Sequence, residues 1–242
     1  MAILSRYLLL CLVFSGLVCA CKAEKPVEQK KAAPIVVVKP KLTLLSQEQR
    51  TELGFPDDLI SKVELAAGAE AEPFFVTVVL HTENLKGDTG FESKKLAGFS
   101  VHTKQGDDLI DRYRAAFRMQ GYLIFKSHRG GYEHLPDVIS VIKGNNSYDI
   151  LKIQSTEGQN YHLDTKAIIA WLRDRQKEGS FVVVGGGTDW LETRFIKPPQ
   201  NMLAFAKKVN AFAPDVLERG PRTVEKLAER MKRMNGFYLE WD

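Results

Sequence analysis

A group of acidic and aromatic residues near the C-terminus could support chemistry on a sugar. They are Asp189, Trp190, Glu192, Trp241 and Asp242. Glycoside hydrolysis uses two carboxylates, one as general acid and one as base or nucleophile, and aromatic side chains can bind the sugar ring. The alternative is structural, because Glu192 alternates with Leu191 and Thr193 along a predicted strand and can pair with Arg194. We therefore treat the five residues as binding or catalytic candidates and assign no catalytic residue.

Three consecutive glycines at 185–187 follow a predicted strand, and glycine-rich loops can bind phosphate through backbone N–H groups. The sequence lacks the Gly-Lys-Ser/Thr ending of a phosphate-binding loop and the third spaced glycine of a dinucleotide fingerprint. The chain after it also continues into a strand, whereas both motifs require a helix. We interpret these glycines as a hairpin turn.

The other residues that hold cofactors or act as nucleophiles are poorly spaced. No two of the five histidines lie at i and i+4, and only His128, Glu133 and His134 share one loop. No serine occurs in a Gly-x-Ser-x-Gly sequence, which a serine hydrolase would require. We expect neither a metal nor a cofactor.

The N-terminus indicates export and lipidation. Arg6 precedes the apolar stretch 7–20, which is too short to span a hydrocarbon core of about 30 Å and is typical of a signal peptide. The end of this stretch, Leu17-Val-Cys-Ala-Cys21, resembles a bacterial lipobox, in which cleavage before Cys21 leaves an acylated first residue. The alternatives are an uncleaved anchor and plain secretion. Since Lys22 rather than aspartate follows, we expect a lipid-anchored protein of the cell envelope, in the outer membrane and facing the periplasm.

Cleavage before Cys21 would also remove Cys11 and Cys19, the other two of the three cysteines. The folded part would then have no free thiol, which excludes a disulfide framework, a cysteine nucleophile and a cysteine-ligated metal. Residues 21–41 are rich in lysine and proline and are expected to form a tether. The formal net charge of +4 is too small to indicate nucleic acid as a partner.

From residue 42 onwards, hydrophobic periodicity predicts alternating helices and strands. Strands are expected at 74–80, 97–103, 122–126, 137–143, 181–184, 190–196 and 237–241, and helices at 46–53, 56–63, 107–121, 146–157, 164–179, 198–213 and 223–236. Asp107 or Asp108 is expected to cap the third helix. This order predicts an α+β fold in which helices pack against a mixed or antiparallel sheet as a two-layer sandwich. Residues 42–96 would be an N-terminal extension of the globular part, and 97–242 the α+β domain.

Several short segments share their order and spacing with a known bacterial family. They are Tyr148-Asp-Ile-Leu-Lys-Ile153, Gly158-Gln-Asn-Tyr161, Asp164-Thr165, Gly187-Thr-Asp-Trp-Leu-Glu192, Ala213-Pro-Asp-Val216 and Leu239-Glu-Trp-Asp242. On these segments residues 137–242, extending back to about residue 97, resemble bacterial domain-of-unknown-function family 4253. The chain departs from the family at His162, Ala213 and Glu240. The resemblance implies one α+β domain that reaches the C-terminus, and no activity.

Two functions remain open after this reading. The first is a non-enzymatic binding module that recognises a protein or an envelope component, with the membrane contacted through the lipid at Cys21. The second is a hydrolase that acts on envelope glycans or peptides through Asp189, Glu192 or Asp242. We favour the binding module because the motifs of known catalytic sites are missing.

Overall fold

A computed structural model describes residues 44–84, 87–130 and 135–241. All described residues belong to one compact unit, residues 41–242. The predicted signal peptide, the tether, Cys21 and Asp242 lie outside the described residues. None of the helices within the described ranges combines the length and the apolar character needed to cross a membrane.

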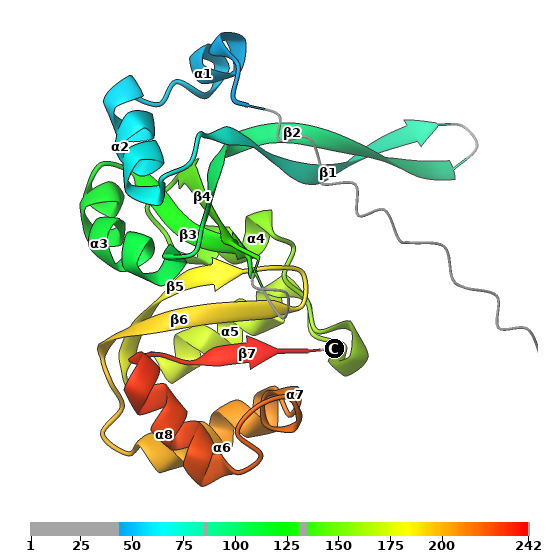
Figure 1. Cartoon of the computed structure of the whole chain (residues 1–242). Coiled ribbons are helices and arrows are strands. Elements are labelled where there is room, and N and C mark those ends of the chain that lie inside the picture. The colour runs from blue at the N-terminus through cyan, green and yellow to red at the C-terminus, as the bar shows by residue number, and fades with distance from the viewer. Residues whose placement is uncertain (1–43, 85–86, 131–134, 242) are drawn as a thin grey trace, which may run out of the picture. The chain divides into compact units, whose positions relative to one another are not determined.

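In the described part of the chain, seven strands form one mixed sheet (Figure 1). The strands are β1 (Glu72–Asn84), β2 (Gly87–Thr103), β3 (Tyr122–His128), β4 (Asp137–Lys143), β5 (Ser180–Gly186), β6 (Trp190–Lys197) and β7 (Tyr238–Glu240). They lie in the order β1-β2-β4-β3-β5-β6-β7. All neighbours are antiparallel except β3 and β5, which are parallel. The α+β class with a mixed sheet is therefore confirmed.

Helices cover both faces of the sheet. They are α1 (Gln47–Leu53), α2 (Asp57–Ala67), α3 (Gly106–Met119), α4 (Tyr148–Ile153), α5 (Thr165–Arg175), α6 (Met202–Phe212), α7 (Asp215–Glu218) and α8 (Val224–Met234), with a 3-10 turn, η2 (Gln159–Tyr161). Along β3, Leu123 and Phe125 pack among α4 to α8, whereas Ile124 packs among α1 to α3. Successive strand residues point to opposite faces, so the two hydrophobic clusters lie on opposite sides. Each face has its own helix layer, where the sequence predicted only one.

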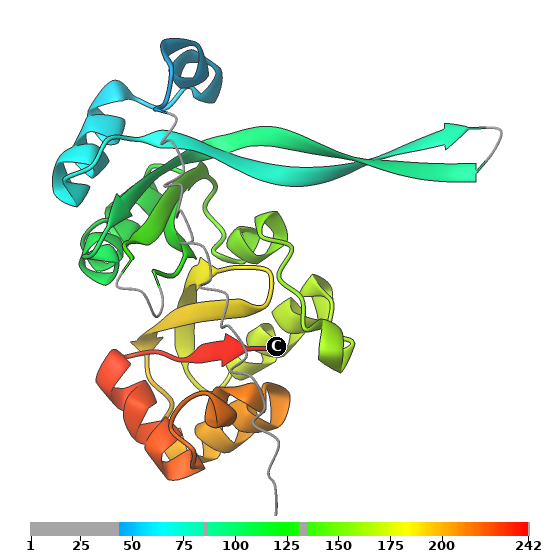
Figure 2. The ribbon, with the colours of Figure 1, turned by 45° about the vertical axis from the view of Figure 1, so that its right-hand side comes forward.

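The first two strands form a long hairpin. Only residues 98–103 of β2 pair with β4, so the earlier part of β2, residues 87–97, forms with β1 a two-stranded ribbon that extends past the rest of the sheet (Figure 2). The expected boundary at residue 97 falls inside β2. Residues 42–96 thus contribute α1, α2, β1 and part of β2 to the same unit.

Helix α4 is shorter than the helix predicted over 146–157. It ends at Ile153, and Ser155 has a φ of +49°, which a continuing helix does not allow. The side chain of Gln154, just beyond the helix, donates hydrogen bonds to the carbonyl oxygens of Ser127 (3.2 Å) and Gly186 (2.8 Å). It therefore joins the C-terminal ends of β3 and β5, the two parallel strands.

Candidate functional site

The predicted acidic and aromatic candidates do not form one catalytic group. Glu192 lies on β6 with its side chain only 8% exposed, whereas Asp189 is exposed in the turn before β6. Trp241 is buried, and its Nε1 donates a hydrogen bond to the carbonyl oxygen of Phe212 (3.2 Å) while the two rings pack edge to face. Trp241 is therefore part of the hydrophobic core.

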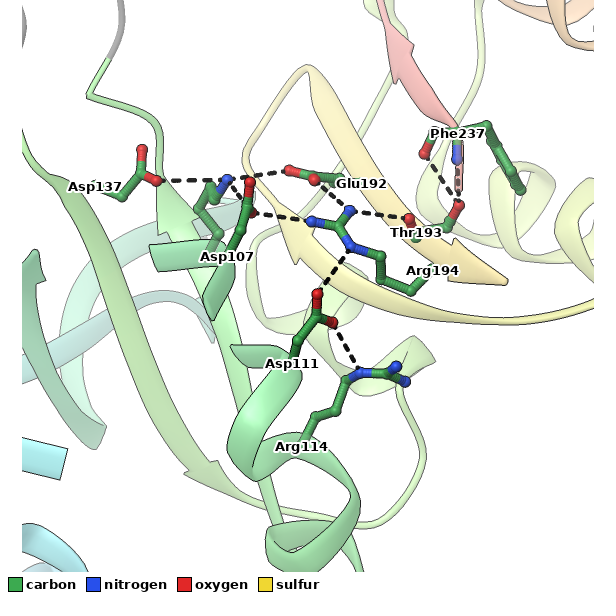
Figure 3. A network of polar contacts seen from close by, with 9 residues as sticks. Asp107, Asp111, Arg114, Asp137, Glu192, Thr193, Arg194 and Phe237 are labelled. Atoms are coloured by element: carbon green, nitrogen blue, oxygen red, sulfur yellow. Dashed lines mark hydrogen bonds and ion pairs between the residues drawn. The ribbon is translucent and has the colours of Figure 1, made fainter. Parts of the chain in front are cut away.

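Glu192 belongs instead to a network of ion pairs on the sheet face that carries α3 (Figure 3). Lys126 of β3 donates a hydrogen bond from Nζ to Asp107 (2.8 Å) and lies 3.3 Å from a carboxylate oxygen of Glu192. Arg194 of β6 contacts Glu192 at 2.5 Å and Asp107 at 3.0 Å. Asp137 of β4 lies 3.4 Å from Lys126. The network thus joins three strands to the first turn of α3.

Asp107 was expected to cap α3, and this prediction was wrong. The residue before the helix is Gln105, without a side-chain capping bond, and Asp107 lies inside the first turn. From there its carboxylate reaches two cations across the sheet, Lys126 and Arg194, which bind it more strongly than a backbone N–H would. Charge pairing over the sheet has replaced the cap.

The charges of the network stabilise one another. Burial alone would raise the pKa of the Asp107 carboxyl, but the hydrogen bond and charge of Lys126, together with Arg194, outweigh burial and hold this pKa below its usual value. Burial alone would lower the pKa of Lys126, but Glu192, Asp107 and Asp137 raise it above its usual value. Both groups are therefore held in their charged forms, which is typical of a structural ion-pair network.

Trp190 contributes to a second cluster, at the edge of the sheet formed by β7. The Arg129 guanidinium lies 4.3 Å from the ring centre of Tyr238 and 5.7 Å from that of Trp190, and the two rings are 6.1 Å apart. The Trp190 ring also covers the glycine turn, because a Cβ on Gly187 would lie 2.2 Å from its Nε1. These contacts are cation–π and packing interactions that fix the β5–β6 turn.

The glycine turn is a hairpin, as predicted. β5 and β6 are antiparallel on either side of it, and its carbonyl groups are bound from outside. Thr156 donates to the carbonyl oxygen of Gly187 (2.7 Å), and the backbone N–H of Glu157 donates to that of Thr188 (2.7 Å). The turn is thus anchored to the segment after α4.

A pocket in the described part of the chain lies where β3 and β5 diverge. These two strands are paired at only one position, Lys126 with Gly185. Nearer the start of β5, side chains take over as partners of its backbone: Val183 N–H donates to Ser147 Oγ (3.3 Å), and the Phe181 carbonyl accepts from Gln176 Nε2 (3.0 Å). The resulting gap has a volume of about 990 Å³.

The walls of this pocket are apolar and its polar groups are cationic or neutral. Aliphatic side chains of β3 and β5, including Ile124 and Val183, line it. Helix α3 contributes Arg114 and Arg118, and the segment before α4 contributes amides and a hydroxyl. No aspartate, glutamate or histidine is among the described residues that line it. The charged side chains that line the pocket are therefore both arginines, one of which, Arg114, pairs with Asp111.

Sequence reasoning missed both the ion network and the pocket. Lys126 at the end of a strictly apolar run, Tyr122-Leu-Ile-Phe, was a usable signal, because a lysine buried in a sheet requires acidic partners. The pocket had no such signal, since it arises from the divergence of two strands. The described residues also hold no cluster of three or more histidine, cysteine or acidic side chains suited to a metal.

Comparison with known proteins finds a family model that matches the C-terminal part of the chain. Residues 138–242 match the model of a family described as a domain of unknown function, DUF4253. The family resemblance drawn from the sequence is thereby confirmed for this part. No curated protein matches the chain, and neither does any solved structure. The match includes β5 and β6, which carry Val183, Glu192 and Arg194, but begins after α3 and β3.

Proposed function

We propose that this protein is a lipid-anchored binding module of the bacterial cell envelope, which recognises an envelope component or a protein without transforming it. The pocket beside α3 carries this proposal. Its described lining supplies apolar surface and hydrogen-bond donors, but no carboxylate or imidazole that could transfer a proton. The Ser147 hydroxyl is occupied by the N–H of Val183 and has no adjacent base among these lining residues to activate it.

The alternative, a hydrolase that uses Asp189, Glu192 or Asp242, has less support. Glu192 contacts Lys126 and Arg194, so a substrate would have to displace both cations to reach it. Asp189 is exposed in a turn, and neither acid lines the pocket. Glycoside hydrolysis requires two carboxylates that face a common substrate. The buried Glu192 and the exposed Asp189 do not meet this requirement.

Native mass spectrometry of the protein, extracted gently from its own cells, tests the proposed binding role. We expect each chain to retain one molecule or one protein partner at a stoichiometric level. Turnover of an envelope glycan or peptide would overturn the proposal if Asp189→Asn or Glu192→Gln abolished it with the fold intact. A chain without any bound molecule, in a cell fraction where the candidate partners are present, would also count against it.

The Cys21→Ser variant tests the anchor. Because only cysteine accepts the diacylglyceryl group, we expect the variant to lose incorporation of labelled fatty acid and to move from the membrane to the soluble fraction. Metabolic labelling and fractionation measure both effects, and Cys19→Ser is the matched control because it should retain the lipid. If Cys21→Ser incorporated as much labelled fatty acid as the wild type, or if the wild type incorporated none, the lipid anchor at Cys21 would be excluded.

A further inference from the structure

The pocket between β3 and β5 is lined by residues from both faces of the sheet. It is lined by Ile124 and Val184, which face α1 to α3, and also by Leu123 and Val183, which face α4 to α8. Its depth is therefore apolar and follows the gap between two strands. At about 990 Å³ it lies at the upper end of the 300–1,000 Å³ that is usual for pockets that bind small molecules.

Positive charge is concentrated where α3 borders this pocket. Arg114 and Arg118 lie one helical turn apart on the same face of α3. Arg114 uses its Nε for Asp111 (3.2 Å), and Arg118 uses its Nε for the Asn145 carbonyl (2.9 Å). These bonds orient the two guanidinium groups, whose terminal nitrogens can bind an anion from one side.

Neutral hydrogen-bond donors and apolar surface complete the border. Asn146 accepts the N–H of Tyr148 through Oδ1 (3.1 Å), which assigns its amide nitrogen as a donor. Met119 and Ile196 are exposed by 84% and 63% and line the same pocket. Exposed apolar surface that is continuous with a groove is typical of a binding site.

We infer that this pocket binds an amphipathic anion with a single acyl chain, such as a long-chain carboxylate. The anionic head would contact Arg114 and Arg118, and the acyl chain would lie in the gap between β3 and β5. Charge complementarity with Arg114 and Arg118 supports an anion, and the aliphatic lining from two strands that pair at only one position supports an acyl chain. This inference rests on the proposed binding function and specifies its ligand.

Binding is tested with cis-parinaric acid, a conjugated fatty acid whose fluorescence rises in an apolar site. The protein is the secreted chain carrying Cys21→Ser, which needs no detergent. We expect saturable binding of one molecule per chain and competition by saturated carboxylates. The affinity of the competitor should rise about fourfold with each added methylene group, until the gap is filled. Dodecyl maltoside, with a neutral head group, should compete at least tenfold more weakly than dodecanoate.

Substitutions on α3 distinguish binding of the probe in the pocket from non-specific binding to other apolar surface. Replacing both arginines, Arg114→Gln with Arg118→Gln, should weaken binding at least tenfold. Ala115→Trp fills the pocket from an exposed helix position and should abolish binding with little effect on folding. Arg112→Gln is the matched control, because Arg112 is exposed on the same helix but does not line the pocket. Circular dichroism and urea unfolding verify that each variant is folded.

The possible failures are distinguishable. If cis-parinaric acid does not bind, or binds equally well to Ala115→Trp, the acyl-chain inference is overturned. If the native mass spectrum then shows a protein, sugar or peptide on the wild-type chain, the binding function stands with a different ligand. If the spectrum shows no bound molecule either, both proposals fail.

Discussion

Lys126→Met is expected to lower the free energy of unfolding by about 3 kcal/mol, because it removes one of two cations that together compensate the acidic side chains of a buried network. The Lys126 and Glu192 side chains are each only 8% exposed, and methionine keeps the volume of the lysine stem. Arg194 would remain as the only cation of the network facing Glu192 and Asp107. Urea unfolding of the wild type and the variant measures the difference.

Lys152→Met provides the matched control for this prediction. Lys152 makes an ion pair of 2.8 Å with Asp149, the same length as the pair between Lys126 and Asp107, but the Lys152 side chain is 58% exposed. Exposed pairs of this kind contribute less than about 1 kcal/mol. Adding Glu192→Gln to Lys126→Met should restore part of the lost stability, because it removes an uncompensated charge. Equal losses for the Lys126 and Lys152 variants would show that solvent screens the network.

The effect of Lys126→Met should also depend on pH. The pKa of Asp107 is lowered in the folded state, so its ionised form contributes stability above its ordinary pKa, and this contribution is lost as the pH falls through the lowered value. The pKa of Lys126 is raised, so its contribution is complete below its ordinary value and is lost only at strongly alkaline pH. The difference in the free energy of unfolding between wild type and variant should therefore be constant near neutrality and should decrease below about pH 4. If this difference increased as the pH fell, the assignment of the charges would be wrong.

Most of the helices and strands could be predicted from the sequence because hydrophobic periodicity and helix signals are local. Met202, Phe205 and Val209 recur at helical spacing, and all three are buried in α6 as this spacing predicts. Ser46 forms the expected cap of α1, as a complete capping box. The second helix layer was missed although β3 carried a signal for it, because consecutive apolar residues such as Leu123, Ile124 and Phe125 indicate a strand that is covered on both faces.

The candidate sites depend on contacts that local patterns do not encode. Asp107 and Lys126 are separated by 19 positions, and Glu192 reaches them only because β5 and β6 pack beside β3. The local pair Glu192 and Arg194, two residues apart on one strand face, was predicted correctly as a structural alternative to catalysis. Sequence spacing identified the pair within one strand, whereas strand order created the network around it.

Strand order also explains why the ion network and the pocket are neighbours. β3 and β5 form the single parallel pair in the described sheet, and they stay in register only near Lys126. At this position the charges around Lys126 hold the strands together, and just beyond it Gln154 bonds to both of them. On the other side, Ser147 and Gln176 bind the backbone of β5 and the strands separate. Weakening the network should therefore widen the pocket, so Lys126→Met should alter ligand affinity as well as stability.

Gly236→Ala is expected to destabilise the fold by about 3 kcal/mol, in the upper range for overpacking of a close contact. Gly236 joins α8 to β7, and a Cβ at this position would lie 2.0 Å from the carbonyl oxygen of Thr193 and 3.2 Å from the Cα of Arg194. Both are backbone atoms of β6, so no side-chain movement relieves the clash. The Thr193 hydroxyl and Phe237 backbone exchange two hydrogen bonds of 3.0 Å beside it, and these would be strained (Figure 3).

Gly68→Ala is the control for this clash. It measures the other cost of replacing a glycine, the strain of a left-handed backbone conformation. Gly68 ends α2 with a φ of +67°, and a Cβ there would meet no atom within 4 Å. The left-handed conformation alone costs about 1 to 2 kcal/mol, and both variants reduce the freedom of the unfolded chain equally. Thermal or urea unfolding should therefore show that Gly236→Ala is less stable than Gly68→Ala. If the order were reversed, β7 would be free to shift away from β6, and the close packing beside Arg194 would not determine the position of the network.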